Sequence, residues 1–467
     1  MSIRVAILYV VVALLVAYAW KDWLISLCGL VLLTTFSQHH DMPERLFGIP
    51  GLNPWNAVLA AVILAWIVHR QRDPLPKPPN YFLLFLIGYV LLITVGFGRA
   101  FVDRQTIIQR GVFPDTVHML FDLLFNPLKY ILVGVMMYDG CRTRKRAAIC
   151  IGTILLFGLL HALMMYKTMG PDVFTGTYED AKRRFDKLIG LHANDLAGLV
   201  TMAFWSSIVV AYAVRGRWRR GAAAMAVIIL PCVIGCHSLA AYLANIGLAG
   251  ILGVLRWRWL LLAFPAGAVL MLVVFPQLGE RFDLAVSGEA ARQEEVNLNA
   301  VTTGRTQNIW GPAIDAIAKS PIIGYGLGGT ARSDAFFGIS QNEGRFTGHP
   351  HNSYLEIMVD HGIVGLAVVL GLIISTAWMG YRLFCVRDDP LFAIVGGMAF
   401  VAIVNVAILG LASSFFYPKE SMLSLICPVA VMARLYPARF SVAARRARAR
   451  TAAAASATAA VYSGGIQ

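Results

Sequence analysis

The sequence is poor in charge. Aspartate, glutamate, lysine and arginine together make up only 14% of its 467 residues, whereas about a quarter of the residues in a soluble domain are charged. Hydrophobic residues reach 58%, and apolar runs of about 20 residues, long enough to cross a bilayer as a helix, recur along most of the chain. The composition therefore excludes an ordinary soluble domain and predicts an all-α polytopic integral membrane protein.

Cysteine is sparse and forms no disulfide pattern. The seven cysteines lie in or beside apolar runs, so we expect no disulfide framework. The stretch CVIGCH at residues 232–237 lacks the C-x-x-C-H spacing of haem attachment, and we expect it to pack in the membrane core. Residues 1–20 lack the small-residue cleavage site of a signal peptide and precede a second apolar run, so we expect them to be retained.

The excess of basic residues does not indicate a nucleic-acid partner. The net charge is +14, yet the cations occur in short clusters between apolar runs, as the positive-inside rule for membrane proteins predicts. We therefore expect membrane lipids, and no nucleic acid, as partners. The clusters that mark cytoplasmic turns begin at His69, Cys141, Arg215, Arg256, Tyr381 and Arg445.

Eleven membrane spans fit between these clusters. Residues 1–36 are expected to add one net crossing, as two half-helices or one bent helix joined at Lys21–Asp22, which gives about twelve crossings. The eleven spans are placed near 54–69, 81–98, 116–138, 147–168, 191–214, 222–237, 239–255, 260–275, 363–384, 391–411 and 421–436.

Four regions follow from this topology. Residues 1–275 form an N-terminal transmembrane bundle, and residues 276–352 form a large helical loop on the outer side, between the late helices. Residues 353–440 return to the membrane, and the basic, alanine-rich tail 441–467 is expected to be disordered and cytoplasmic. A loop as long as the outer one would be unusual without a function, so we expect it to carry site residues.

The stretch TTGRTQNIWGPAIDAIAKSP, residues 302–321, predicts an amphipathic helix in this loop. Thr302 or Thr303 is expected to cap its start, and Pro321 to stop it. Arg305 then falls in the first turn, where free N–H groups and a guanidinium could together bind a phosphate; a surface arginine paired with a carboxylate is the alternative. The glycines of PIIGYGLGG, which follows, predict a flexible turn and do not match a nucleotide-binding motif.

The stretch GHPHNSYLEIMVDHGIVG, residues 348–365, concentrates titratable side chains at a membrane boundary. Ser353 and Glu356 have the spacing of a capping box, which would place His351 immediately ahead of a helix N-terminus. Gly362 is expected to end this short helix in the left-handed conformation, before the next span begins.

Three histidines compete for a chemical role in this stretch. His351 can accept a proton from a hydroxyl near neutral pH, which makes it the candidate general base. His349 is a candidate ligand-binding group, and His361 is expected to satisfy carbonyl groups at the end of the short helix. The paired-histidine spacing of a helical zinc site is absent, so we expect no metal and no cofactor.

A second outer segment also carries polar side chains. Arg183 and Arg184 are cations on the side where the positive-inside rule disfavours them. His192 and Asn194 then stand at the start of a span, a depth at which polar residues usually line a cavity. A further outer basic group, expected to be solvated, consists of Arg99, Arg104 and Arg110.

Three motifs in this order resemble those of the O-antigen ligase and polymerase superfamily. The form His-Asn, nine residues, Gly-x-x-Gly at 351–365 resembles its signature. The stretch GRTQNIWGPAIDAIAKSPIIGYGLGG at 304–329 is similar to its upstream Gly-Arg segment, and LIGLHANDLAGL at 188–199 is similar to its Asn-x-x-Ala segment. The resemblance covers most of the chain.

The resemblance implies a GT-C-type, metal-independent glycosyltransferase on the periplasmic side of a Gram-negative inner membrane. Ligases of this superfamily move O-antigen from undecaprenyl diphosphate to a sugar hydroxyl of lipid A–core, and direct attack of this kind inverts the anomeric centre. By motif, His351 would be the general base and Arg305 would bind the diphosphate. The further candidates for binding diphosphate or substrate are Arg184, Arg183, His349, Asn352 and Asn194.

Three other functions stay open. A polymerase of the same superfamily transfers one lipid-linked glycan onto another, and a protein O-oligosaccharyltransferase transfers it to protein. The His-Asn form with Gly-x-x-Gly favours the ligase, as does the modest length without the extra C-terminal domain expected of many protein-glycosylating members. A flippase or transporter would show internal repeats and charges at mid-membrane, whereas here the charge gathers at the outer boundary.

Overall fold

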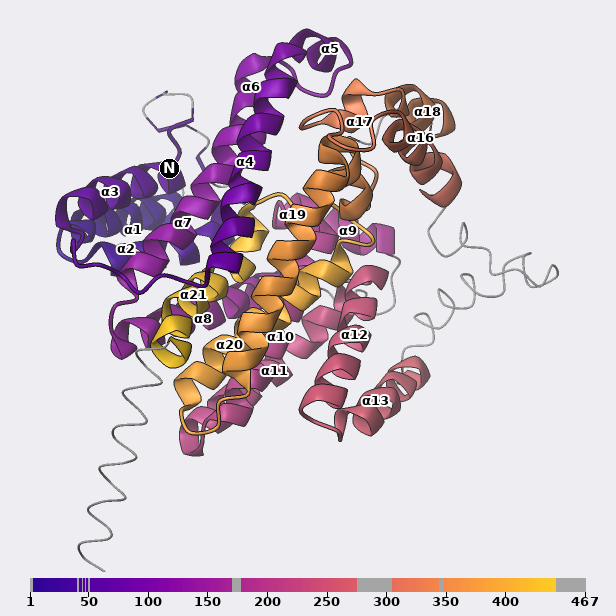
Figure 1. Cartoon of the computed structure of the whole chain (residues 1–467). Helices are drawn as coiled ribbons and strands as arrows, with labels where there is room; N and C mark the ends of the chain where they lie inside the picture. The colour runs from indigo at the N-terminus through magenta and orange to yellow at the C-terminus, as the bar shows by residue number, and fades with distance from the viewer. Residues whose placement is uncertain are drawn as a thin grey trace, which may run out of the picture.

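The apolar runs of the sequence fold as a bundle of helices (Figure 1). The computed structural model describes residues 3–39, 51–169, 178–274, 305–343 and 348–441, and the single positions 42, 43, 45, 46 and 48. Every regular element among these residues is a helix. This is the architecture expected of a polytopic membrane protein, because a helix satisfies its own backbone N–H and C=O groups within lipid.

Eight helices of the described residues are long and apolar enough to cross a membrane, and four shorter apolar helices accompany them. The eight are α4 (Asn80–Val102), α6 to α7 (Thr116–Gly140), α8 (Arg144–Thr168), α10 (Ala193–Ala213), α11 (Gly216–Gly235), α19 (Ser353–Phe384), α20 (Pro390–Leu409) and α21 with its first turn (Glu420–Phe440). The shorter ones are α1 (Ile3–Ala19), α2 with its last turn (Trp23–Phe36), α3 (Pro54–His69) and α12 (Leu239–Leu255). With α13 (Leu260–Val274), a helix lies at each of the eleven predicted spans.

The centre of the bundle depends on close packing of small residues. Where α10 meets α20, Gly198 faces Leu409, and the Asn405 side chain donates from Nδ2 to the Gly198 carbonyl at 3.0 Å. Where α19 meets α20, a Cβ atom on Gly396 would lie only 2.6 Å from the Gly380 carbonyl oxygen. Small residues and interhelical hydrogen bonds hold membrane helices together, because lipid tails are as apolar as the helix surfaces.

The first two helices pack side by side and not end to end. Ser26 Oγ on α2 donates to the Leu15 carbonyl on α1 at 2.8 Å, although residues eleven apart in one helix are separated by about 16 Å. The turn closes where the N–H groups of Lys21 and Asp22 both donate to the Tyr18 carbonyl, at 2.9 and 3.0 Å. The two helices therefore form a hairpin and do not continue each other at Lys21–Asp22 as predicted, while the number of crossings made by residues 1–36 stays a prediction.

Short helices cover one end of the bundle, around the start of α19 (Figure 1). The predicted amphipathic helix is present from Arg305 onwards, first as the π-helical turn η5 (Thr306–Trp310) and then as α16 (Gly311–Lys319). The others are α17 (Gly329–Arg332), α18 (Ala335–Glu343) and, from earlier in the chain, α5 (Arg104–Gln109). The predicted caps Thr302 and Thr303, the loop residues 276–304 and the tail 442–467 lie outside the described residues.

Candidate functional site

The segment His349-Pro350-His351 ends at the cap of α19. Asn352 is the N-cap residue, and its Oδ1 accepts hydrogen bonds from the N–H groups two and three positions further on, at 3.0 and 3.2 Å. His351 therefore stands immediately ahead of the helix N-terminus, as predicted. Because the Asn352 oxygen is used by the cap, its NH2 group is the part of that side chain that could meet a ligand.

The two histidines of this segment lie together. The His351 N–H donates to His349 Nδ1 at 3.1 Å, and the two ring centres are 4.3 Å apart. His351 has a φ of 53°, in the left-handed region that residues with a Cβ atom seldom adopt. Backbone strain of this kind tends to occur at functional sites, where the surroundings impose it.

The predicted capping box is wrong. Ser353 Oγ donates to the Ser413 carbonyl at 2.6 Å and accepts from the Phe415 N–H at 2.7 Å, so it does not turn back onto its own helix. Glu356 accepts a hydrogen bond from Ser414 Oγ at 2.5 Å. The segment after α20 supplies partners for both side chains, and Asn352 has taken over the capping of α19. Glu356 is therefore a half-buried polar group held by a tertiary contact, which the local spacing could not reveal.

Gly362 interrupts α19 with a kink. Its φ of 61° and ψ of −159° are open only to glycine, and a Cβ atom there would overlap the backbone of Ile322. The positive φ was predicted, but the helix resumes directly after Gly362. The expected stop is instead a bend that separates the short outer part of α19 from the long part that follows.

The glycine-rich segment 321–328 repairs the hydrogen bonds that this kink breaks. The Tyr325 N–H donates to the Val359 carbonyl at 2.8 Å, and the Gly326 N–H donates to the Asp360 carbonyl at 2.6 Å. In return, the two N–H groups after the kink donate to carbonyls at the start of the segment, at 2.8 and 3.3 Å. The predicted flexible turn is thus a fixed partner of α19, since buried backbone groups must be paired.

His361 does not satisfy carbonyl groups, which corrects its expected role. Its ring is buried beside the kink, where a Cβ atom on Gly96 of α4 would overlap it. Within the described part of the chain its Nε2 has no hydrogen-bond partner. The carbonyls that it was expected to satisfy are taken by the 321–328 segment, so His361 is a packing residue between α4 and α19.

Arg305 is held in place beside the loop after α20. It stands at the first described position of the helix that leads into α16, is half-buried, and donates from Nη1 to the Ala412 carbonyl at 2.9 Å. Trp310, one turn further on, donates from Nε1 to the Pro350 carbonyl at 3.1 Å. These two contacts join the amphipathic helix to the loop after α20 and to the histidine segment, which brings Arg305 and the histidines into one region.

Burial and nearby cations keep His349 neutral. Burial lowers the pKa of its imidazole to about 4, and the positive charge of Lys419 acts in the same direction. Arg305 and His192 also lower this pKa, while the negative charge of Asp195 opposes them. The electrostatic surroundings of His349 therefore come from three parts of the chain: the amphipathic helix, the start of α10 and the end of the loop after α20.

Lys419 belongs to this site and was not found from the sequence. Its Nζ forms an ion pair with Asp195 Oδ1 at 2.6 Å and donates to the Ser414 carbonyl at 2.8 Å. The available signal was a lysine in the short outer segment 412–420, on the side where the positive-inside rule disfavours it. A lone lysine there is ambiguous until the fold shows its neighbours.

The second predicted segment contributes through the start of α10. His192 is the N-cap of α10, and its Nδ1 accepts from the Asn194 N–H at 3.2 Å. Asn194 Oδ1 accepts from Ser238 Oγ at 2.9 Å, which ties α10 to the cap of α12. On the preceding α9 (Tyr178–Leu188), Arg184 is half-buried and Arg183 is exposed. That either arginine binds diphosphate stays a prediction.

Two arginines that were expected to be solvated hold the outer helices in place. Arg99 donates from Nη1 to the Ile323 carbonyl and from Nη2 to the Gly324 carbonyl, both at 2.7 Å. Arg110 donates from Nη1 to the Ala331 carbonyl at 2.6 Å. Both are therefore structural ties between the first half of the chain and the 321–333 region, and the expectation of solvated side chains is wrong for them.

The groups gathered at this end of the bundle suit transfer chemistry. Two cations, Arg305 and Lys419, lie near enough to His349 to lower its pKa, and the neighbouring His351 carries an imidazole, a group that can accept a proton. Within the described residues, no three His, Cys, Asp or Glu side chains gather as ligands for a metal ion. The arrangement offers a base and positive charge together at the N-terminal end of a helix, which also favours anions.

Comparisons with known proteins show what the chain is similar to. Residues 224–370, which include Arg305 and both histidines of the pair, match the protein family described as O-Antigen ligase. A curated relative, the Exopolysaccharide production protein ExoQ of Rhizobium meliloti (strain 1021), is 25% identical over 275 residues. The match covers 55% of this chain and 59% of the relative, so the chain spans somewhat more than half of that protein's length.

Proposed function

Since the chain belongs to the O-antigen ligase and polymerase superfamily, we propose that it is a glycosyltransferase that uses a lipid-linked glycan as its donor. The observation that carries the proposal is the His349–His351 pair ahead of α19, with Arg305 and Lys419 close enough to act on the charge of His349. A neutral imidazole can remove a proton from a sugar hydroxyl, and fixed cations stabilise the charge that a departing diphosphate develops.

His351 is the general base of the proposed reaction. Its ring takes the proton of the acceptor hydroxyl while the hydroxyl oxygen attacks the anomeric carbon of the donor sugar. The bond from that carbon to the diphosphate oxygen breaks on the opposite face, and the electron pair leaves with the diphosphate. A single displacement of this kind inverts the anomeric centre and needs one base, unlike the paired carboxylates of glycoside hydrolases.

Arg305 and Lys419 stabilise the leaving diphosphate. Arginine can donate two parallel hydrogen bonds to phosphate oxygens, and a lysine supplies a compact positive charge. Arg184 or Arg183 on α9 adds a further cation, just before the cap of α10. The side chains proposed to position substrate are His349, Asn352 and Asn194.

The donor in this proposal is O-antigen on undecaprenyl diphosphate, and the acceptor is a sugar hydroxyl of lipid A–core. The protein is then an O-antigen ligase with a GT-C-type fold of about twelve crossings in a Gram-negative inner membrane, and its site faces the periplasm. Two lipid-anchored substrates account for a site at the end of a transmembrane bundle and not in a soluble domain. The basic turns on the opposite side support this orientation.

A second candidate is transfer of the glycan onto another lipid-linked glycan. The relative named for exopolysaccharide production favours it, because that name concerns a polymer and not lipopolysaccharide. The proposed base and cations would serve both reactions, since only the acceptor differs.

The test is reconstitution with purified components. Full-length protein, undecaprenyl-diphosphate-linked O-antigen and rough lipopolysaccharide are mixed without metal or nucleotide, and the products are separated by gel electrophoresis and mass spectrometry. Capped lipopolysaccharide is the expected product. Elongated lipid-linked glycan would identify a polymerase, and neither product under conditions that keep the protein folded would contradict the proposed transfer.

A further inference from the structure

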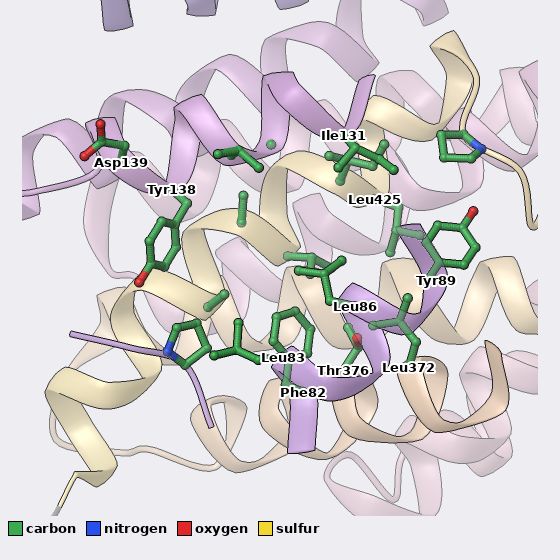
Figure 2. Close-up of a pocket in the computed structure, with 18 of the residues that line it drawn as sticks. Phe82, Leu83, Leu86, Tyr89, Ile131, Tyr138, Asp139, Leu372, Thr376 and Leu425 are labelled. Carbon is green, nitrogen blue, oxygen red and sulfur yellow. The ribbon is translucent and has the colours of Figure 1, made fainter. Parts of the chain in front are cut away.

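A large apolar groove lies between α4, α7 (Asn126–Gly140), α19 and α21, and its lining does not include the histidine pair or Arg305. Its volume is about 760 Å³, within the range of small-molecule binding sites. The middle of the groove is hydrocarbon-like, since it is lined by Leu83, Leu86, Ile131, Leu372, Leu425 and Val429. Figure 2 shows these leucine and isoleucine side chains between two different ends of the groove.

The two ends of the groove differ in charge. Every charged residue of the lining belongs to the segment 70–78 or to the end of α7 and the two residues after it: Arg70, Arg72, Asp73, Lys77, Asp139 and Arg142. The opposite end is uncharged and consists of Tyr89, Phe415, Phe416, Pro418 and Met422. Figure 2 shows Tyr138 and Asp139 at one end and Tyr89 at the other.

Hydrogen bonds hold the charged end in place. The Tyr138 hydroxyl donates to the Pro76 carbonyl at 2.7 Å, which fixes the proline-rich segment next to Lys77. Arg142 Nη2 donates both to the Gln71 carbonyl and to Asp139 Oδ1, each at 2.6 Å. Since Asp139 is paired with Arg142, the remaining lining charges are three cations against the single carboxylate of Asp73. The end of the groove is therefore a net positive rim.

We propose that this groove binds an anionic phospholipid, with the phosphate among Arg70, Arg72 and Lys77 and an acyl chain along the apolar walls. Basic pockets between transmembrane helices on the cytoplasmic side recognise anionic headgroups, and the basic cluster at 69–79 is placed on that side by the positive-inside rule. From Tyr138 to Ile131 the wall of α7 runs for about 10 Å, so the groove reaches into one leaflet, which is about 15 Å deep.

The position of the charges separates this lipid from the substrates of the transfer reaction. The uncharged end is the one near the candidate site, because the loop that supplies Phe415 and Phe416 also supplies the Ala412 carbonyl that binds Arg305. A diphosphate-linked donor would need its charged group at that end. The groove has its cations at the other end, so it fits a second lipid that joins α4, α7 and α21 and stabilises the bundle.

Phosphatidylglycerol added to the full-length protein provides the first test. The protein is purified in detergent, titrated with phosphatidylglycerol or phosphatidylcholine, and followed by native mass spectrometry and thermal unfolding. We expect phosphatidylglycerol to be retained and to raise the Tm, and phosphatidylcholine to do neither. The double variant Arg72→Glu/Lys77→Glu is expected to bind phosphatidylglycerol about tenfold more weakly or worse, because each basic residue near an anionic lipid contributes to affinity.

Two further variants control for general charge and for the apolar walls. Arg219→Glu/Arg220→Glu changes two exposed cations at the start of α11, also on the cytoplasmic side, and is expected to bind phosphatidylglycerol as the wild type does. Leu86→Trp fills the groove and is expected to abolish retention with the basic rim intact. Equal binding by wild type and the Arg72/Lys77 variant would overturn the proposal. Displacement of phosphatidylglycerol by undecaprenyl phosphate would instead assign the groove to the chain of a substrate.

Discussion

At the scale of single residues, His351 combines an exceptional backbone with a suitable side chain. Among the described residues other than glycine, only His237 shares its positive φ. The left-handed turn places the His351 N–H on His349 Nδ1, so that the geometry of one histidine depends on the other. A role as general base gives a reason for keeping a histidine where asparagine or glycine would fit the backbone with less strain.

Replacing His351 by asparagine separates the side-chain chemistry from the backbone. Asparagine tolerates a positive φ, so His351→Asn is expected to fold normally and to transfer glycan at least about 100-fold more slowly than the wild type. The measurement is the initial rate of capped lipopolysaccharide formation. The matched control is His118→Asn, which changes an exposed histidine on α6 (Thr116–Leu120) that pairs with Asp115. Full activity in His351→Asn would remove His351 from the mechanism.

The half-buried His349 makes stability depend on pH. Burial lowers its pKa to about 4 in the folded protein, while an unfolded chain has a histidine pKa of about 6.5. Between these values the unfolded state binds more protons, so the contribution of neutral His349 to stability is present above about pH 6.5 and is lost as the pH falls towards 4.

The expected result is a Tm that falls across this window in the wild type and falls less in His349→Asn. Thermal unfolding followed by intrinsic fluorescence, at constant ionic strength, measures the difference. Identical pH profiles for both proteins would show that His349 is not the group responsible.

At the scale of elements, α19 and the 321–328 segment form one unit. Neither is complete alone, because each supplies the donors and acceptors that the other lacks at the kink. The arrangement also holds the histidine segment, since α19 begins with the Asn352 cap and α16 is joined to Pro350 through Trp310. The outer part of α19 is thus positioned by contacts on both sides of the kink at Gly362.

The substitution Gly362→Ala tests this unit. The added Cβ atom would overlap the backbone of Ile322, and the φ of 61° would be strained, by about 1–3 kcal/mol from the backbone alone. We expect a lower Tm and a loss of transfer. Gly98→Ala on α4 is the matched control, because its Cβ atom would meet nothing within 4 Å, and alanine favours a helix. A Gly362→Ala protein as stable and active as the control would contradict the account of the kink.

The spans were the most predictable elements, and the first hairpin was the least. Apolar runs between basic clusters predicted a helix at each of the eleven positions, because the bilayer imposes both length and composition. The same composition describes two helices that continue each other and two that fold back. What decided between them was a tertiary contact, the hydrogen bond from Ser26 to Leu15.

At the scale of the whole molecule, the site is assembled by ties between distant parts of the chain. The loop after α20 touches Arg305 through Ala412, Glu356 through Ser414 and Asp195 through Lys419. It therefore joins the amphipathic helix, the outer part of α19 and the start of α10.

Exchanging the charges of Lys419 and Asp195 separates the two roles of this ion pair. Lys419→Asp and Asp195→Lys are each expected to lower the Tm. Each change places two like charges at the positions where Lys419 Nζ and Asp195 Oδ1 now lie 2.6 Å apart. The double exchange is expected to restore the Tm but to transfer glycan about 100-fold more slowly, because the cation has moved away from the proposed diphosphate position. Recovery of both stability and transfer would make Lys419 a structural residue only.

The sequence by itself determined the class of protein, the positions of the helices and the resemblance that singled out His351 and Arg305. These depend on composition and on motifs, which are local properties of the chain. Only the tertiary structure decided that α19 starts with the Asn352 cap and not with a capping box, and that Gly362 bends the helix. It also decided that Arg99 and Arg110 donate hydrogen bonds to the 321–333 region. The physical reason is competition: a side chain or backbone group pairs with the partner that the fold brings nearest, and in the case of Glu356 that partner lies 58 residues away.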